Sequence, residues 1–385
     1  MTNVLTEEQQ HDLLKRGFTR RSFGRLAAMV GAGAAAMPFY NEPALAQLSK
    51  VADAPPDAVL INANENPLGP CKEAREAAHN MIQHGGRYRY SEGDKVQKLL
   101  SEQEGVKSNY IRIHPGSSGP LHQAVLAFTS PTRPFVTGDP GYEAGERAAK
   151  FIGAEVIRVP LMKDKGYAHD VKAMAAASAN AGLIYICNPN NPTGTLTPKE
   201  DIEWLVANKP KGAVVMIDEA YTHIAGAPFH SHLVAADKDV VILRTFSKIY
   251  GMAGLRAGAA LARPDLQEKM NGFSQTMMPI TGMAAASASL EAKYLVPERR
   301  KLIGDVRENT FEFLEKHNFS FVQQSKSNCF MIDVKRPGNE IITAMRKENV
   351  YIGRVWPSWP THVRVTVGNA EEMGKFKSAF LKVMT

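Results

Sequence analysis

The feature that most constrains the fold is a series of short apolar runs that alternate with amphipathic stretches. The clearest runs are residues 183–187, 213–217 and 240–243, and residues 198–208 between them are amphipathic. Apolar runs of this length are typical of strands that helices cover on both faces of a parallel sheet. The sequence therefore predicts an α/β fold with a mostly parallel central sheet.

Each of these three runs ends in a polar cluster: Asn-Pro-Asn-Asn-Pro-Thr-Gly at 188–194, Asp-Glu-Ala-Tyr at 218–221 and Thr-Phe-Ser-Lys at 245–248. Singly, the clusters could be a turn, a helix N-cap and a solvated loop. Open parallel sheets, however, bind ligands at the carboxyl ends of their strands. An amide, an acid and a lysine at three such ends together indicate a ligand site.

Pyridoxal phosphate (PLP) accounts for this combination of residues. Its aldehyde requires a lysine whose pKa is lowered by desolvation, and its ring nitrogen requires a buried carboxylate. Its phosphate requires backbone N–H groups, hydroxyls and an arginine. Lys248, Asp218 and Arg256 supply residues of these kinds.

The motifs resemble the class I/II aminotransferases of PLP fold type I. The segments 61–67 (Ile-Asn-Ala-Asn-Glu-Asn-Pro) and 363–368 (Val-Arg-Val-Thr-Val-Gly) resemble the histidinol-phosphate aminotransferase-like branch. The resemblance extends from about residue 60 to the C-terminus. With the pattern of apolar runs, it implies an N-terminal arm (47–75), a large PLP-binding domain (76–285) and a smaller α+β domain (286–385).

The resemblance also implies roles around the cofactor ring. Lys248 would form the Schiff base and later shuttle a proton at the substrate Cα, while Asp218 would pair with the ring nitrogen. Asn191 and Tyr221 would hydrogen-bond the phenolic oxygen, and Tyr142 would stack on the ring unless it is simply a core or rim tyrosine.

The cofactor phosphate would be held by a second group of residues. Ser247 and Arg256 would bind it, and the loop containing Ser117 and Ser118 would present backbone N–H groups. In the family a tyrosine reaches the phosphate from the partner subunit of a homodimer. Tyr90 is in that position, with Tyr88 as the alternative.

Three residues would bind the substrate. Arg364 would hold its α-carboxylate as a bidentate clamp, assisted by Asn64 from the arm. Arg354 aligns with a family position that contacts the substrate's phosphate, although a surface or capping role is equally open. Trp356 and Trp359 could line the pocket or pack the small domain.

The first 46 residues have the features of a leader and are not expected to be part of the fold. Arg20-Arg21 precedes a weakly apolar stretch at 26–37 that is shorter than the roughly 20 residues of a membrane span, and Ala44-Leu45-Ala46 follows. The pattern resembles a twin-arginine (Tat) signal. We expect the Tat machinery to export the folded protein to the periplasm. We also expect cleavage before Gln47, which would leave no stable membrane span. An uncleaved amphipathic anchor is the main alternative.

Charge and cysteine content favour a small-molecule enzyme. The 46 Lys and Arg against 39 Asp and Glu give +7, but the positive residues are scattered and do not predict nucleic-acid binding. Three widely spaced cysteines give no disulfide framework. His230 and His232 lack a third ligand at a sensible spacing, so no metal is expected.

The resulting hypothesis is a PLP-dependent transaminase that moves an amino group between an amino acid, or a related amine, and a keto acid. Other PLP chemistry on the same scaffold (racemase, decarboxylase or oxidase) and a non-catalytic exported binding protein are the alternatives. Because histidine biosynthesis is cytoplasmic, the leader argues against histidinol phosphate as the physiological substrate. An imported, envelope or secondary-metabolite amine is expected instead.

Overall fold

The computed structural model describes residues 7–19, 54–273 and 277–385. The twin arginine, the apolar stretch at 26–37 and the Ala44-Leu45-Ala46 motif lie outside these described residues. The predictions about export and cleavage concern these residues.

Strands and helices alternate through the centre of the chain. The strands are β1 (Val59–Ile61), β2 (Ile111–His114), β3 (Phe135–Asp139), β4 (Val156–Pro160), β5 (Leu183–Cys187), β6 (Val214–Asp218), β7 (Val240–Thr245), β8 (Gly258–Ala262), β9 (Ser320–Phe321), β10 (Cys329–Asp333), β11 (Val350–Ile352) and β12 (His362–Thr366). The α-helices are α1 (Glu7–Lys15), α4 (Lys72–Ile82), α5 (Tyr90–Glu104), α6 (Ser118–Phe128), α7 (Ala144–Phe151), α8 (Val171–Ala176), α9 (Lys199–Asn208), α10 (Thr222–Ala225), α11 (Ser231–Ala235), α12 (Pro264–Asn271), α13 (Ile280–Glu291), α14 (Leu295–Lys316), α15 (Gly338–Lys347) and α16 (Ala370–Met384).

The central sheet has seven strands in the order β2-β8-β7-β6-β5-β3-β4. Neighbouring strands from β7 to β4 are parallel, whereas β8 runs antiparallel to both β7 and β2. The predicted α/β fold with a mostly parallel sheet is confirmed. The antiparallel β8 was not predicted, because its Gly- and Ala-rich run gives a weak strand signal.

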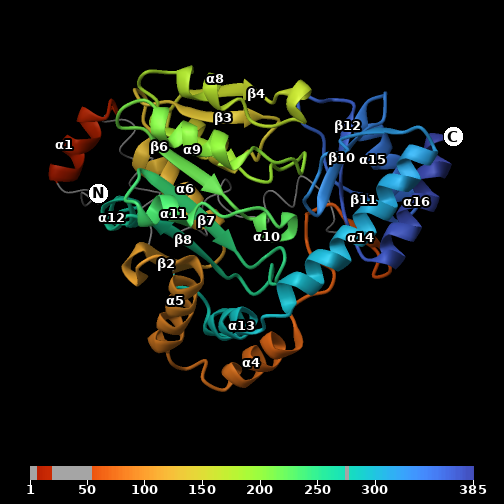
Figure 1. Cartoon of the computed structure of the whole chain (residues 1–385), viewed down its shortest axis with the longest axis horizontal. Helices are drawn as coiled ribbons and strands as arrows, with labels where there is room; N and C mark the ends of the chain where they lie inside the picture. Colours follow the sequence, from red (N-terminus) through yellow and green to blue (C-terminus); the bar gives the residue numbers. More distant parts are fainter. Residues whose placement is uncertain (1–6, 20–53, 274–276) are drawn as a thin grey trace.

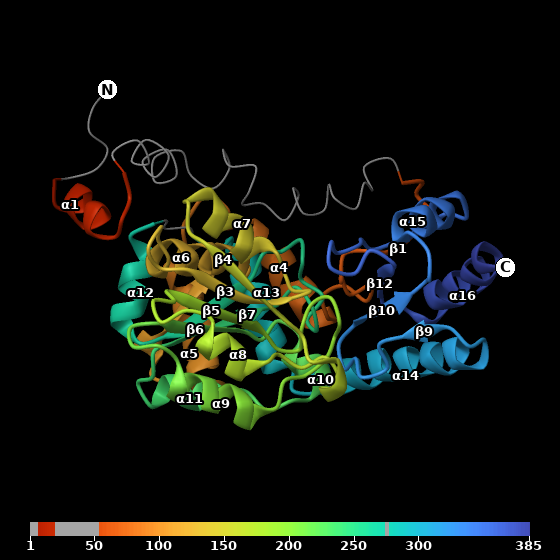
Figure 2. The same cartoon turned by 90° about the horizontal axis from the view of Figure 1, so that it is seen from above.

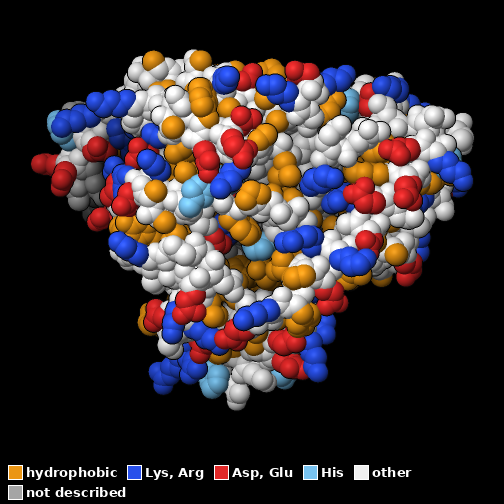
Figure 3. Space-filling model, viewed as in Figure 1, with side chains coloured by type: hydrophobic (Ala, Val, Ile, Leu, Met, Phe, Trp, Pro, Cys, Tyr) orange, Lys and Arg blue, Asp and Glu red, His pale blue; other side chains and the backbone are white. Residues whose placement is uncertain are grey.

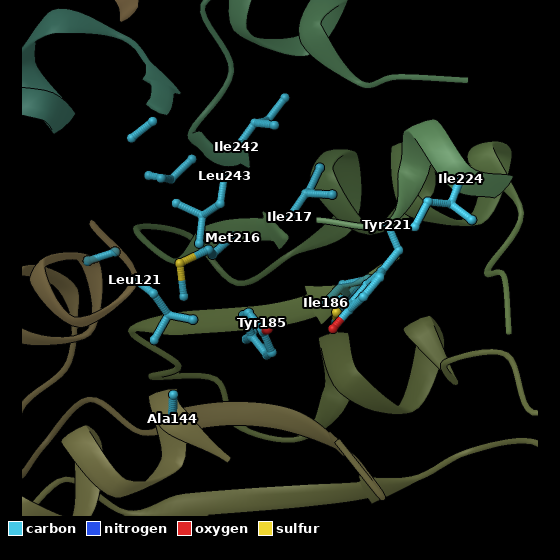
Figure 4. Close-up of a cluster of buried hydrophobic side chains, with 14 of the residues drawn as sticks. Leu121, Ala144, Tyr185, Ile186, Met216, Ile217, Tyr221, Ile224, Ile242 and Leu243 are labelled. Carbon is cyan, nitrogen blue, oxygen red and sulfur yellow. The ribbon is translucent and has the colours of Figure 1, made fainter. Parts of the chain in front are cut away.

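Helices cover both faces of this sheet, with α6 and α7 on one side and α9 and α11 on the other (Figure 2). Every residue of β5, β6 and β7 is buried, which explains why these strands read as continuous apolar runs. Figure 4 shows side chains of these strands lying together with Leu121 of α6 and Ala144 of α7. The core therefore lies directly behind the strand ends that carry the polar clusters.

The C-terminal part of the chain forms a separate three-stranded sheet, β12-β10-β9, beside α14, α15 and α16 (Figure 1). From the N-terminal arm, β1 pairs in parallel with β11, Val59 lying opposite Val350. The arm is thereby fixed to the C-terminal part before the chain enters the large sheet. This pairing places the residues that follow β1 between the two parts.

A second contact comes from the segment of α1, which differs from the expectation that the leader region lies outside the fold. Leu13 and Phe18 are buried, being 6% and 3% exposed. Arg16 donates from Nη2 to the carbonyl oxygens of Leu126 and Ala127 at 2.6 and 3.1 Å, at the end of α6. This segment therefore packs on the large sheet's helical layer.

The surface in Figure 3 has basic and acidic side chains interspersed on the visible face, without a continuous basic stripe. Over residues 7–19, 54–273 and 277–385, no helix combines the length and apolar character needed to cross a membrane.

Candidate active site

A cavity of about 370 Å³ opens where β5, β6 and β7 end, between the large sheet and the C-terminal part. The predicted site residues all line it except Tyr90 and Arg256. Those that line it are Asn64, Ser117, Ser118, Tyr142, Asn191, Asp218, Tyr221, Ser247, Lys248, Arg354 and Arg364. Residues from 64 to 364 thus converge on one cavity, as expected for strand ends in an open sheet.

Asp218 ends β6 as a buried carboxylate that two groups orient. Tyr185 of β5 donates its hydroxyl to Oδ2 at 2.9 Å, and the backbone N–H of Ala220 donates to Oδ1 at 3.2 Å. Burial raises the pKa of Asp218, and the hydrogen bond from Tyr185 opposes that rise. A cation placed beside this carboxylate would favour its charged form, which is what a protonated ring nitrogen requires.

Lys248 follows β7 and is partly buried at the same cavity. Its Nζ lies 5.7 Å from the centroid of the Tyr221 ring. Asn66 of the arm donates from Nδ2 to the carbonyl oxygens of Lys248 and Ile249, both at 3.1 Å. Asn66 was not predicted, although it belongs to the Asn-Glu-Asn-Pro motif, and it fixes the backbone that carries the lysine.

Tyr221 is positioned by the arm as well. Asn64 donates from Nδ2 to the Tyr221 hydroxyl at 3.0 Å, and its own backbone N–H donates to Thr366 Oγ1 at 2.9 Å. Burial raises the pKa of Tyr221 well above its usual value, so this hydroxyl keeps its proton and can donate it in a hydrogen bond. Asn64 therefore connects the large sheet to β12 at the cavity.

Arg364 of β12 is buried, with only 4% of its surface exposed. It donates from Nη1 to Asn191 Oδ1 at 2.9 Å and from Nη2 to the Asn62 carbonyl at 2.5 Å. Within the described part of the chain its Nε has no hydrogen-bond partner. A buried guanidinium with an unsatisfied donor at a cavity is suited to a carboxylate ligand.

The start of α6 and the loop before it are suited to binding an anion. Ser117 and Ser118 line the cavity at the helix N-terminus, where backbone N–H groups and the helix dipole favour negative charge. Arg256 donates from Nη2 to the Pro115 carbonyl at 3.1 Å, directly below this loop. Gly116 has φ of +83° and no space for a Cβ, because the Arg256 guanidinium occupies it.

Tyr90, like Arg256, is a predicted site residue that does not line the cavity of its own chain. It is 68% exposed and stacks on Tyr88 with ring centroids 5.7 Å apart. This position agrees with a contact to another subunit and excludes a contact to the cavity of the same chain.

Several cavity residues had no sequence signal. Tyr185, which contacts Asp218 from the core side, belongs to a strand in which every residue is buried. No sequence pattern distinguished it from an ordinary core residue. The remaining lining residues that were not predicted are Ala63, Glu65, Cys187, Ala220, Thr245 and Ala253.

The donor set fits PLP. It combines a lysine, a buried carboxylate, a hydroxyl and amide pair, a helix N-terminus with serine hydroxyls and a buried arginine with an orphaned donor, all at one cavity. No group of three metal-type ligands occurs among the described residues.

Known proteins agree with this reading. The family model for aminotransferase class I and II matches residues 56–380. A histidinol-phosphate aminotransferase of Symbiobacterium thermophilum is 32% identical over 84% of this chain and 90% of the relative, and histidinol-phosphate aminotransferase 1 of Nitrosococcus oceani is 32% identical over 83% and 87%.

Solved structures show the same fold. A protein assigned as a histidinol-phosphate aminotransferase from Erwinia carotovora atroseptica matches with a TM-score of 0.81 and 29% identity, over 86% of this chain and 97% of that one. The histidinol-phosphate aminotransferase of Sinorhizobium meliloti, solved with pyridoxal-5'-phosphate, matches with a TM-score of 0.78 and 24% identity, over 89% and 94%.

Proposed function

We propose that this chain, which belongs to the aminotransferase class I and II family and is a PLP-dependent transaminase, acts in the periplasm. There it would transfer amino groups between an α-amino acid and a keto acid. The observation that carries the substrate class is Arg364. Its buried guanidinium belongs to the lining of the cavity that also contains Lys248, and its Nε has no hydrogen-bond partner among the described residues. A carboxylate on the substrate Cα would pair with this guanidinium and bring Cα towards the lysine.

The residues at the ring have distinct proposed roles. PLP, when bound, supplies an electron sink for the electron pair released at the substrate Cα. Lys248 Nζ removes and returns the Cα proton, and Asp218 stabilises positive charge on the ring nitrogen. Asn191 and Tyr221 donate to the phenolic oxygen, and Tyr142 covers the ring. The Asn191 amide suits this role, because its oxygen already accepts from Arg364 and its nitrogen is the group that can donate.

The cofactor phosphate is assigned to the start of α6, with Ser117, Ser118, Ser247 and Arg256 as its ligands. The close contact between Gly116 and the Arg256 guanidinium supports this assignment. It brings the loop, the N-terminus of α6 and a positive charge together. In the proposed division into an arm (47–75), a large domain (76–285) and a small domain (286–385), the cavity lies at the junction of all three.

We propose that the enzyme is a homodimer in which Tyr90 reaches the partner's phosphate site. Tyr88 and Tyr90 are exposed and stacked on each other, as is typical of aromatic residues at subunit interfaces. This supports their burial in a dimer interface. Sedimentation establishes the oligomeric state. Tyr90→Phe should weaken PLP binding, whereas the matched Tyr88→Phe should not; the reverse ranking would assign the role to Tyr88.

Export is proposed on the leader pattern alone. Replacing Arg20 and Arg21 together by lysine should retain the protein in the cytoplasm, as measured by cell fractionation, whereas replacing the nearby Arg16 by lysine should not. Export that persists in a strain without Tat machinery would contradict the proposal.

The transaminase half-reaction tests the function directly. Purified protein lacking residues 1–46 and loaded with PLP is mixed with single amino acids, and absorbance follows conversion of the cofactor to its amine form. Conversion should require Lys248 and be weakened by Arg364→Gln mainly through KM. Absence of conversion with every amino acid tested, or turnover of histidinol phosphate alone, would contradict the proposal.

A further inference from the structure

Arg354 lines the cavity, but its guanidinium already forms an ion pair with another residue of the chain. Nη1 and Nη2 donate to the two carboxylate oxygens of Glu143 at 3.2 and 2.7 Å, and the two side chains are only 11% and 19% exposed. This bidentate pairing uses the planar donor fork that would otherwise receive an anion. The cavity wall at Arg354 therefore presents a paired charge.

Trp356 fixes the position of this pair. The Arg354 guanidinium lies 4.7 Å from the Trp356 ring centroid, and the Arg364 guanidinium lies 5.5 Å from it. Trp356 is 2% exposed and donates from Nε1 to the Gly141 carbonyl at 2.8 Å. The indole thus holds two arginines side by side and attaches them to the loop that carries Glu143.

Glu143 balances the charge of both arginines. Burial and the neighbouring Arg354 lower the pKa of Arg364, and Glu143 acts in the opposite direction. A substrate with a single carboxylate neutralises Arg364 and leaves the Arg354–Glu143 pair intact. A second anionic group would have to displace Glu143, leaving a half-buried carboxylate without its partner.

We propose that Glu143 is a specificity-determining residue that selects amino acids with an uncharged side chain and disfavours those carrying a second carboxylate or a phosphate. This inference rests on the proposed function, in that Arg364 receives the α-carboxylate. Glu143 acts through Arg354 and has no part in moving the Cα proton.

L-Glutamine and L-glutamate form the matched substrate pair, since they have the same shape and differ in one charge. Half-reaction rates with each are measured in the PLP-loaded full-length protein, in Glu143→Gln and in the control Glu146→Gln. Glu146 lies three residues further along, in the first turn of α7, but pairs with Arg158 and Lys150 and not with Arg354. Equilibrium binding of both amino acids is also measured in a Lys248→Ala background, where slow turnover cannot mask affinity.

The native protein should bind L-glutamine more tightly than L-glutamate, and Glu143→Gln should shift this preference towards L-glutamate by about tenfold, through KM rather than kcat. Glu146→Gln should leave it unchanged. The inference is overturned if the native protein prefers L-glutamate, if L-glutamine does not bind, or if Glu143→Gln leaves the ratio unchanged. Failure of the proposed function is separate: Arg364→Gln would then leave the affinity for both amino acids unaltered.

Discussion

Tyr185 donates its hydroxyl proton to Asp218 across two neighbouring strands, at 2.9 Å, with both side chains buried. Because the tyrosine lies inside the core, solvent cannot take over its hydrogen bond to Asp218. Its hydrogen bond stabilises the charged carboxylate against the cost of burial, which is the dominant influence on the Asp218 pKa. Tyr185 is therefore a positioning residue for Asp218.

Tyr185→Phe should weaken PLP binding. Removing the hydroxyl leaves Asp218 Oδ2 without a donor, and a hydrogen bond to a buried charged group contributes about 1.5 kcal/mol, equivalent to about tenfold in Kd. Absorbance titration of the leaderless protein with PLP measures this. Tyr110→Phe, which removes a tyrosine hydroxyl that donates to the exposed Asp237, is the control, and equal affinity in the two variants would contradict the role of Tyr185.

Asp218→Asn should stabilise the PLP-free protein while weakening PLP binding. Because burial raises the Asp218 pKa above its unfolded value, the group favours the folded state at low pH, and that contribution is lost as the pH rises through the raised pKa. The stability of the variant relative to the native protein should therefore increase as the pH rises from 3.8, the ordinary aspartate pKa, through the raised pKa of Asp218. Thermal unfolding without cofactor measures the gap, and a gap that shrinks with rising pH would oppose this account.

Gly116→Ala should destabilise the loop before α6, the proposed phosphate site, whereas Gly119→Ala should not. A Cβ at 116 would overlap the Arg256 guanidinium at a φ of +83°, but a Cβ at 119 meets nothing within 4 Å. Strain of this kind costs about 1–3 kcal/mol, so Gly116→Ala should also retain PLP poorly. Unfolding temperature and PLP Kd of the two variants check this, and indistinguishable variants would refute it.

Arg16→Ala should release the segment of α1 from the large sheet's helical layer. Its guanidinium hydrogen-bonds the end of α6, and loss of charge-assisted bonds of about 1.5 kcal/mol should speed proteolysis of this segment about tenfold. The exposed Lys15→Ala serves as the matched control in the full-length protein. Equal cleavage rates would mean that Arg16 does not hold the segment.

Site residues could be predicted from the sequence where a local pattern marks them. Asn191, Asp218 and Lys248 each follow a continuous apolar run, so local pattern located both the strand and its functional end. Tyr185 and Glu143 could not be found in this way. Their roles arise from contacts between distant segments, such as the contact between Glu143 and Arg354, which are 211 positions apart in the sequence. Local periodicity carries no information about such contacts.

The antiparallel β8 and the docked segment of α1 escaped prediction for related reasons. Small side chains in β8 carry little strand preference. Leu13 and Phe18 are too few to give a periodic pattern, although both become buried on a surface that exists only after the chain folds.

The central claim is that Lys248 carries the cofactor, and the most direct test is to locate the bound PLP chemically. The purified protein is reduced with borohydride to make the lysine–cofactor bond permanent, digested and analysed by mass spectrometry. The phosphopyridoxyl group should be found on Lys248 and should be absent from Lys248→Ala. A label on a different lysine, or an unlabelled Lys248 in protein that retains PLP, would contradict the account.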